Sequence, residues 1–327
     1  MSTSGSNSYI INSSDGRTIH PSQTTGTRSD KSEKTTTKVT SVTGRTWELS
    51  HNAKLKLEGA YGYVRCITDP LTREVYAGKK MKPGVYKELA TSSNPISEIQ
   101  HEIDLLRSLK PHPNVIKLTD LIITKDKKGQ DMVILVMPWI GEGSFNKQKQ
   151  ISNDQILGIC NGLKHIHDNG FMYLDMKGPN VVFNEQGIPV IVDLGYMIKI
   201  GEDPGANFSP QFVSPEQLNN KTASNKSDIF SLGCMLFEKK EGVFPYEIIG
   251  ANSNGEIKTK EATSPEEAME MISNFSKTKL STCLDALYNN NYLTKKEKTF
   301  FTLLLHPDPN KRGNIDEVIK ALPDNLL

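Results

Sequence analysis

Cysteine and net charge are both scarce in this chain, and each scarcity argues against a class of protein. The four cysteines are scattered and form no CxxC pair, which is typical of reduced thiols in a cytosolic protein. A formal net charge of +1 indicates no strong electrostatic attraction to nucleic acid or to a membrane surface.

Long apolar runs are missing as well. No stretch of about 18 apolar residues is present to span a bilayer. Met1 is not followed by the basic and then apolar stretch of an ordinary secretory signal. We therefore expect a cytoplasmic protein with no membrane span and no nucleic acid partner, and its 327 residues are enough for one large core or two small ones.

The beginning of the chain is rich in hydroxyl groups and poor in core-forming residues. Within residues 1–46, 21 positions are Ser or Thr, and none is Trp, Phe or Leu. Such a segment buries too little apolar surface to offset its ordering entropy. We expect a disordered tail here, either a tolerated extension or a segment for phosphorylation, partner binding or export.

Hydrophobic periodicity after Trp47 predicts a sheet followed by helices. Apolar residues alternate over 55–77, as in half-buried strands, and recur at helical spacing over 96–109 until a Pro-His-Pro string ends the helix. Residues 132–137 are continuously apolar, which predicts a buried strand, and the helical pattern returns over 156–166 and again from 229 to 236.

Four short features carry polar groups that suit phosphoryl transfer. They are YAGK at 76–79, Glu102 within the first predicted helix, DMKGPN at 175–180 and DLG at 193–195. Transfer of a phosphoryl group from ATP needs a cation on the α- and β-phosphates, an anion that orients it, a carboxylate beside the attacking hydroxyl and two oxygen ligands for Mg²⁺. The four features supply each of these parts once.

The spacing of these features makes the pattern specific. Asp175 lies five positions before Asn180 and eighteen before Asp193, and Asp193 lies 23 positions before Glu216. With these motifs at these intervals, the chain resembles the eukaryotic-type protein kinase family over about residues 55–322.

The resemblance implies an α+β fold with two lobes. A kinase domain at 47–327 would follow the tail, with an N-lobe of antiparallel sheet plus one helix at about 47–137. A mainly helical C-lobe would occupy about 141–327, joined to the N-lobe near residues 138–141.

The resemblance also implies roles for the polar residues. Lys79 and Glu102 would form the ion pair that aligns ATP, with Glu98, one helical turn earlier, as the alternative partner. Asp175 would accept or orient the proton of the substrate hydroxyl, and Lys177 would neutralise charge on the transferred phosphate.

ATP and Mg²⁺ are the cofactors that the resemblance implies. Asn180 and Asp193 offer hard oxygen ligands suited to Mg²⁺, while the carbonyl of Pro138 and the N–H of Ile140 would bind adenine. The family's first phosphate-loop glycine is replaced by Leu57. The nucleotide-binding residues expected on this basis are Leu57, Gly59, Gly62, Val64, Ala77, Lys79, Met137, Pro138, Ile140 and Val182.

Two stretches resemble Ser/Thr kinases rather than tyrosine kinases. Lys177 stands two places after the aspartate and is followed by Gly-Pro, and Ser209 falls where Ser/Thr kinases keep a hydroxyl beside the acceptor. Glu216 resembles the residue that forms a buried bridge with an arginine, here Arg312. Asp228 resembles the residue that holds the catalytic-loop backbone, and Phe230 follows it where the family usually has Trp.

The chain between Asp228 and Arg312 is longer than in the family's compact members. Its polar stretch at 252–266 predicts an inserted loop, and the wider segment 250–298 is a candidate site for a partner.

One departure from the family concerns control. The family usually has His-Arg before the catalytic aspartate, where the arginine receives the phosphate of a phosphorylated activation loop. This chain has Tyr173 and Leu174 there, and the only hydroxyl between Asp193 and Ser209 is that of Tyr196. The sequence therefore resembles a kinase that does not wait for activation-loop phosphorylation.

Our prediction is an ATP- and Mg²⁺-dependent protein serine/threonine kinase that acts on Ser or Thr hydroxyls of a protein substrate. The alternative is a pseudokinase scaffold that binds partner proteins without phosphoryl transfer, and a third interpretation is a kinase for small molecules or lipids. A translocated bacterial effector and a divergent eukaryotic kinase both fit the sequence, and for an effector the expected location is the host cytoplasm.

Overall fold

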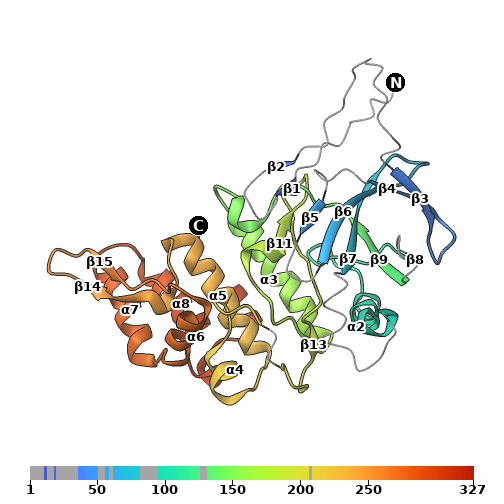
Figure 1. Ribbon diagram of the computed structural model, residues 1–327. Helices are drawn as coiled ribbons and strands as arrows, with labels where there is room; N and C mark the ends of the chain where they lie inside the picture. The colour runs from blue at the N-terminus through green and yellow to red at the C-terminus, as the bar shows by residue number, and fades with distance from the viewer. Residues whose placement is uncertain are drawn as a thin grey trace, which may run out of the picture. The chain divides into compact units, whose positions relative to one another are not determined.

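The computed structural model describes residues 11–12, 18–19, 36–50, 56–58, 62–81, 95–125, 131–205 and 208–327. The chain divides into two compact units, each described by itself below. The first is Met1–Ser144 with Val182–Gly187, and the second is Phe145–Val181 with Ile188–Leu327 (Figure 1).

The first unit is built on an antiparallel sheet. Its described strands run in the order β3-β4-β6-β7-β9-β8, and β5 also pairs with β6. The helix α2 packs beside β9 (Figure 1). The elements are β1 Ile11–Asn12, β2 Thr18–Ile19, β3 Thr36–Thr40, β4 Thr46–Ser50, β5 Lys56–Glu58, β6 Gly62–Thr68, β7 Val75–Met81, α2 Pro95–Ser108, β8 Asp120–Lys125 and β9 Asp131–Pro138.

One face of this sheet forms a hydrophobic core. Trp47, Ile67, Ile122, Ile134 and Val136 are all buried in one cluster. Their alternation along the strands sends the neighbouring residues to the opposite face. The opposite face is packed as well, since Leu121, Val133 and Leu135 are each at most 6% exposed, and it is the face that carries Lys79.

The prediction of a disordered tail is wrong for residues 36–46. This segment forms β3 and the turn that leads into β4, with Val39 opposite Trp47. Its Thr- and Val-rich sequence favours a strand, and Val39 packs against the hydrophobic core. Residues 1–35, apart from the short strands β1 and β2, lie outside the described residues.

The turn between β3 and β4 is held to β8 by polar contacts. The buried carboxylate of Asp120 accepts a hydrogen bond from Thr43 Oγ1 at 2.9 Å and another from Trp47 Nε1 at 3.0 Å. Arg45 pairs with Asp69 and lies over the Trp47 ring, 4.4 Å from its centroid. The β3–β4 hairpin is therefore an integral part of the sheet.

The second unit is mainly helical. Its longest described helix, α5, is buried on every side over Ser227–Phe237, where most residues are apolar. The helices are α3 Asn153–Asp168, α4 Pro215–Asn220, α5 Asn225–Glu241, α6 Pro265–Ser273, α7 Lys277–Asn289, α8 Lys295–Leu305 and α9 Ile315–Ala321. The short 3₁₀ helices are η2 Phe145–Lys147, η3 Gly178–Asn180, η4 Pro245–Glu247 and η5 Pro309–Lys311. The strands are β10 Phe171–Met172, β12 Pro189–Ile191, β13 Ile198–Lys199, β14 Ile248–Ala251 and β15 Ile257–Thr259, while β11 Val181–Phe183 runs from this unit into the first.

Local sequence sets the ends of these helices. Ser152 and Gln155 form a capping box at the start of α3, and Thr294 and Glu297 form one at the start of α8. Gly242 ends α5 in the left-handed conformation, with φ of 75°. The described sheet and the helix α2 of the first unit, with the helices of the second, confirm the predicted α+β class.

The predicted loop at 252–266 is structured instead. It supplies the turn and the second strand of the β14–β15 hairpin, and β14 packs against α7 (Figure 1). Asn252 Oδ1 accepts the N–H groups of Asn254 and Glu256, so side-chain hydrogen bonds order the polar turn. Among the described residues, no helix is long and apolar enough to cross a membrane.

Candidate active site

In the first unit, Lys79 and Glu102 form an ion pair. Lys79 Nζ lies 2.6 Å from Glu102 Oε1, and the side chains are 12% and 7% exposed. Lys79 stands on β7 and Glu102 on α2, so strand and helix are joined by a charge-assisted hydrogen bond. The predicted pairing is present in the structure, whereas the side chain of the alternative, Glu98, lies outside the described residues.

Residues expected to contact adenine share one face of the sheet with Lys79. Val64 lies opposite Lys79 in the register of β6 and β7, and Ala77 lies opposite Met137 in that of β7 and β9. Directly opposite residues point to the same face. This face is opposite to the one that carries Trp47 and Ile67.

The packing of the hydrophobic core explains why position 78 of β7 is a glycine. A Cβ at Gly78 would stand 2.9 Å from Ile67 and 3.1 Å from Ile134, both in the hydrophobic core. The glycine therefore lets the core side chains close against β7, while Ala77 and Lys79 point to the other face.

The other expected nucleotide residues are described to different extents. Pro138 and Ile140 are half-buried at and after the end of β9, and Val182 forms an isolated bridge with Ser144. The backbone of Leu57 pairs with Val64, and that of Gly62 pairs with Met81. Gly59 lies outside the described residues.

In the second unit, Asp175 lies at the centre of a polar cluster. Its carboxylate is buried, with Lys177 Nζ at 3.0 Å from Oδ1 and 2.9 Å from Oδ2. Ser209 Oγ donates to Asp175 Oδ1 at 2.6 Å and accepts from Lys177 Nζ at 2.7 Å. A hydroxyl group thus already occupies a position between the carboxylate and the ammonium group.

The surroundings of Asp175 make it a weaker acid than an exposed aspartate. Burial raises the pKa of this carboxyl, and the positive charge of Lys177 opposes the rise without cancelling it. A carboxylate with a raised pKa is a stronger base, which suits proton transfer from a hydroxyl.

Asn180 connects this cluster to the expected metal ligands. Its amide nitrogen donates to Asp175 Oδ2 at 2.6 Å and to the Asp175 carbonyl at 3.0 Å. The amide oxygen is then the atom left for a cation, which agrees with a Mg²⁺ ligand. The N–H of Val192 donates to the Asn180 carbonyl at 2.9 Å, so the segment that carries Asp193 runs beside Asn180.

These two donors fit Mg²⁺ better than a metal held by protein alone. Among the described residues, no group of three or more His, Cys, Asp or Glu side chains is placed to hold a metal ion. Mg²⁺ keeps several waters and takes one or two carboxylates plus substrate phosphates. An oxygen from Asn180 and a carboxylate from Asp193 match this requirement.

Asp228 organises the backbone before Asp175. Its buried carboxylate accepts the N–H of Tyr173 at 2.9 Å and that of Leu174 at 2.7 Å, with His167 Nε2 at 2.9 Å. Leu174 has φ of 62°, a left-handed conformation that is strained for a leucine. The hydrogen bonds to Asp228 stabilise this backbone, as the sequence predicted.

The hydroxyl of Tyr173 makes a contact that sequence reasoning missed. It donates to the carbonyl of Val192 at 2.6 Å, directly before Asp193, and the tyrosine is fully buried. The catalytic loop and the DLG segment are therefore linked both through this hydroxyl and through the Val192 N–H to Asn180. The position of Tyr173 next to the motif was the only signal in the sequence.

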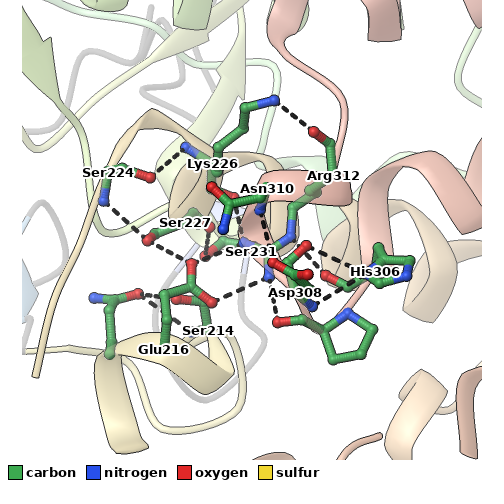
Figure 2. Close-up of polar contacts among 12 residues, drawn as sticks. Ser214, Glu216, Ser224, Lys226, Ser227, Ser231, His306, Asp308, Asn310 and Arg312 are labelled. Atoms are coloured by element: carbon green, nitrogen blue, oxygen red, sulfur yellow. Dashed lines mark hydrogen bonds and ion pairs between the residues drawn. The ribbon is translucent and has the colours of Figure 1, made fainter. Parts of the chain in front are cut away.

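The end of the activation segment is fixed by Glu216 and Arg312 (Figure 2). Arg312 Nη1 lies 2.8 Å from Glu216 Oε1, and Nη2 lies 3.1 Å from Oε2. Burial would raise the pKa of Glu216, but the hydrogen bonds and charge of Arg312 outweigh it and lower the pKa. Arg312 also lies over the ring of Phe230 at 5.0 Å, the residue found where the family usually has Trp.

Comparison with protein families matches residues 56–322 to the protein kinase domain. The match covers most of the chain, so this chain belongs to the protein kinase family and has its bilobal fold, as predicted.

Individual relatives are similar at low identity. Serine/threonine-protein kinase 16 of Homo sapiens is 25% identical over 220 residues, which are 59% of this chain and 69% of that protein. Cell division control protein 7 of Schizosaccharomyces pombe is 29% identical over 260 residues, 76% of this chain. Cytokinesis protein sepH of Aspergillus terreus is 27% identical over 199 residues, 58% of this chain. The chain covers only 23% of the Schizosaccharomyces protein and 14% of the Aspergillus protein.

Proposed function

We propose that this chain is a protein serine/threonine kinase that transfers the γ-phosphoryl group of ATP to Ser or Thr hydroxyls of a protein substrate. The observation that carries the proposal is the arrangement of Asp175, Lys177 and Ser209, in which a serine hydroxyl lies within 2.7 Å of both charged groups. An acceptor hydroxyl from a substrate would find the same base and the same cation.

Each residue then has a defined task. Asp175 takes the proton of the acceptor hydroxyl as the new O–P bond forms and the bond between γ-phosphorus and the ADP oxygen breaks. Lys177 stabilises the charge on the transferred group. Asn180 and Asp193 would hold Mg²⁺, which would neutralise charge on the phosphates.

The ion pair in the first unit supports the same function. Glu102 fixes the position of the Lys79 ammonium group, which is the cation expected on the α- and β-phosphates. A preorganised cation costs no reorganisation during the reaction and is more effective for that reason. The ion pair is formed in this structure, which supports the proposed role of Lys79.

We further propose that the enzyme is competent without phosphorylation of its activation loop. Leu174 is buried, and its N–H is held by Asp228, so no buried positive charge at this position awaits a phosphate. Tyr173 adds a hydrogen bond to the DLG segment that depends on no modification. The partner proposed for residues 250–298 stays a prediction.

The test is transfer of labelled phosphate from MgATP to a generic protein substrate. The wild type should label the substrate, Asp175→Ala should not, and Asp168→Ala, which removes an exposed carboxylate, should retain full activity. Asp175→Ala should keep its affinity for MgATP, whereas Asp193→Ala should lose affinity because it removes a metal ligand. MgATP binding without transfer by the wild type would favour the pseudokinase instead.

A further inference from the structure

A short basic segment contacts the catalytic loop of the second unit. This segment, residues 145–150, comprises η2 and the three residues after it, with the sequence FNKQKQ. The side chain of Asn146 lies against Gly178, and a Cβ at Gly178 would stand 1.5 Å from Asn146 Oδ1. Only glycine permits this approach, so Gly178 allows the basic segment to pack directly against the catalytic loop.

A lysine from α5 fixes the basic segment from its other side. Lys239 Nζ donates to the carbonyl of Gln148 at 2.5 Å and to that of Asn146 at 3.4 Å. The same ammonium group lies 5.9 Å from the centre of the buried Phe145 ring. The basic segment is thus held both to α5 and to the catalytic loop, and its position relative to Asp175 is defined.

The two lysines of the basic segment have no acidic partner among the described residues. Lys147 and Lys149 are exposed, and neither forms an ion pair with any residue that the structure describes. Other lysines of the same unit do have partners, such as Lys164 with Asp168. The basic segment therefore presents two uncompensated positive charges close to the catalytic loop.

We propose that Lys147 and Lys149 bind acidic side chains of the protein substrate, so that the enzyme favours Ser or Thr with Asp, Glu or phosphorylated residues nearby. The inference rests on the proposed kinase function and names the substrate class of that site. Lys147 follows Asn146, which touches Gly178, and Gly178 adjoins Lys177 at the transfer site. The path from the two lysines to the transfer site at Lys177 spans on the order of 10–15 Å, which is the length of roughly three to five residues of extended peptide.

The expected size of the preference follows from the exposure of these lysines. Ion pairs between exposed side chains are weak, so two of them should change kcat/KM by about fivefold to tenfold. The preference should shrink between about 0.1 M and about 1 M salt, where the Debye length falls from about 10 Å to about 3 Å.

The experiment compares peptides that contain one serine and differ only in a pair of residues roughly three to five positions from it, placed before the serine in one set and after it in the other. The pair is Glu-Glu, Gln-Gln or Lys-Lys. For the wild type, kcat/KM should be highest for Glu-Glu on one side and lowest for Lys-Lys. Lys147→Glu with Lys149→Glu should reverse the order, and Lys147→Gln with Lys149→Gln should abolish the preference while the Gln-Gln peptide is still phosphorylated.

A matched control uses Lys277 and Lys279 on α7. These lysines have the same spacing, are exposed and form no ion pair with a described residue, so their change to Glu alters net charge equally. This control should keep the wild-type order. Equal turnover of all peptides by the wild type, or reversal by the control variant as well, would overturn the inference and leave the kinase function intact. Failure to phosphorylate any peptide or any generic protein would instead refute the kinase function.

Discussion

Breaking the buried pair of Glu216 and Arg312 should destabilise the second unit, and by different amounts from the two sides. The arginine side chain is fully buried and the glutamate side chain is 5% exposed. Removing one partner of a buried pair leaves an uncompensated charge and costs about 3–5 kcal/mol. The contacts that remain after each substitution decide where in this range each variant falls.

Arg312 keeps several acceptors when Glu216 is replaced. Its nitrogens also donate to the carbonyls of His306 at 2.9 Å and Lys226 at 2.6 Å (Figure 2). Among the residues that the structure describes, Glu216 has only the Ser227 hydroxyl, at 2.8 Å, as another side-chain donor. We therefore expect Glu216→Gln to cost about 3 kcal/mol and Arg312→Met about 5 kcal/mol in free energy of unfolding.

Urea unfolding of the two single variants and of the double variant measures this difference. The double variant should be more stable than the two single losses predict, because neither residue then leaves an unpaired charge. Equal losses, or a larger loss for Glu216→Gln, would show that the carbonyl contacts do not stabilise Arg312 as described here.

The pair should also make stability depend on pH. Because the folded pKa of Glu216 is lowered, its contribution is fully present above the ordinary glutamate value of about 4.3. The contribution is lost as pH falls through the lower folded value. Stability of the wild type should therefore fall more steeply in acid than that of Glu216→Gln.

Three further predictions concern activity and the first unit. Lys79→Met should lower turnover by about a hundredfold or more. Glu102→Gln should also lower turnover, and the two effects should be less than additive in the double variant because the two residues form one unit. Full additivity in steady-state kinetics would count against the pair. A chain that begins at residue 36 should unfold at the same urea concentration as the full chain. A chain that begins at residue 46 lacks β3, and its free energy of unfolding should be lower by about 2 kcal/mol. Equal urea midpoints for these two shortened chains would show that the β3–β4 hairpin adds no stability. Because burial raises the pKa of Asp175, the acid limb of the pH–rate profile should lie above the ordinary aspartate value of about 3.9, and a limb at or below that value would exclude this residue as the base.

Motif spacing predicted the parts of the site that depend on local sequence. The pairings of Lys79 with Glu102 and of Glu216 with Arg312 join residues far apart in sequence, and only the family resemblance identified them. Asp228 was assigned to the catalytic-loop backbone in the same way, and the structure shows both hydrogen bonds.

Other features could not be predicted because they depend on tertiary contacts. The strand β3 has the composition of a disordered segment, yet Val39 gains a core contact and Thr43 gains a buried carboxylate. The contact of Asn146 with Gly178 joins two loops, and nothing in the sequence of either loop indicates that they touch. The Tyr173 hydroxyl finds the Val192 carbonyl only once both loops are in place.

The most direct test of the central claim is phosphate transfer by phosphatase-treated protein, followed by identification of the phosphorylated amino acids in the substrate. We predict that the treated protein transfers phosphate from MgATP at nearly the untreated rate, with label on Ser and Thr. Absence of label, label on Tyr alone, or activity that returns only after rephosphorylation of Tyr196 or Ser209 would contradict the account.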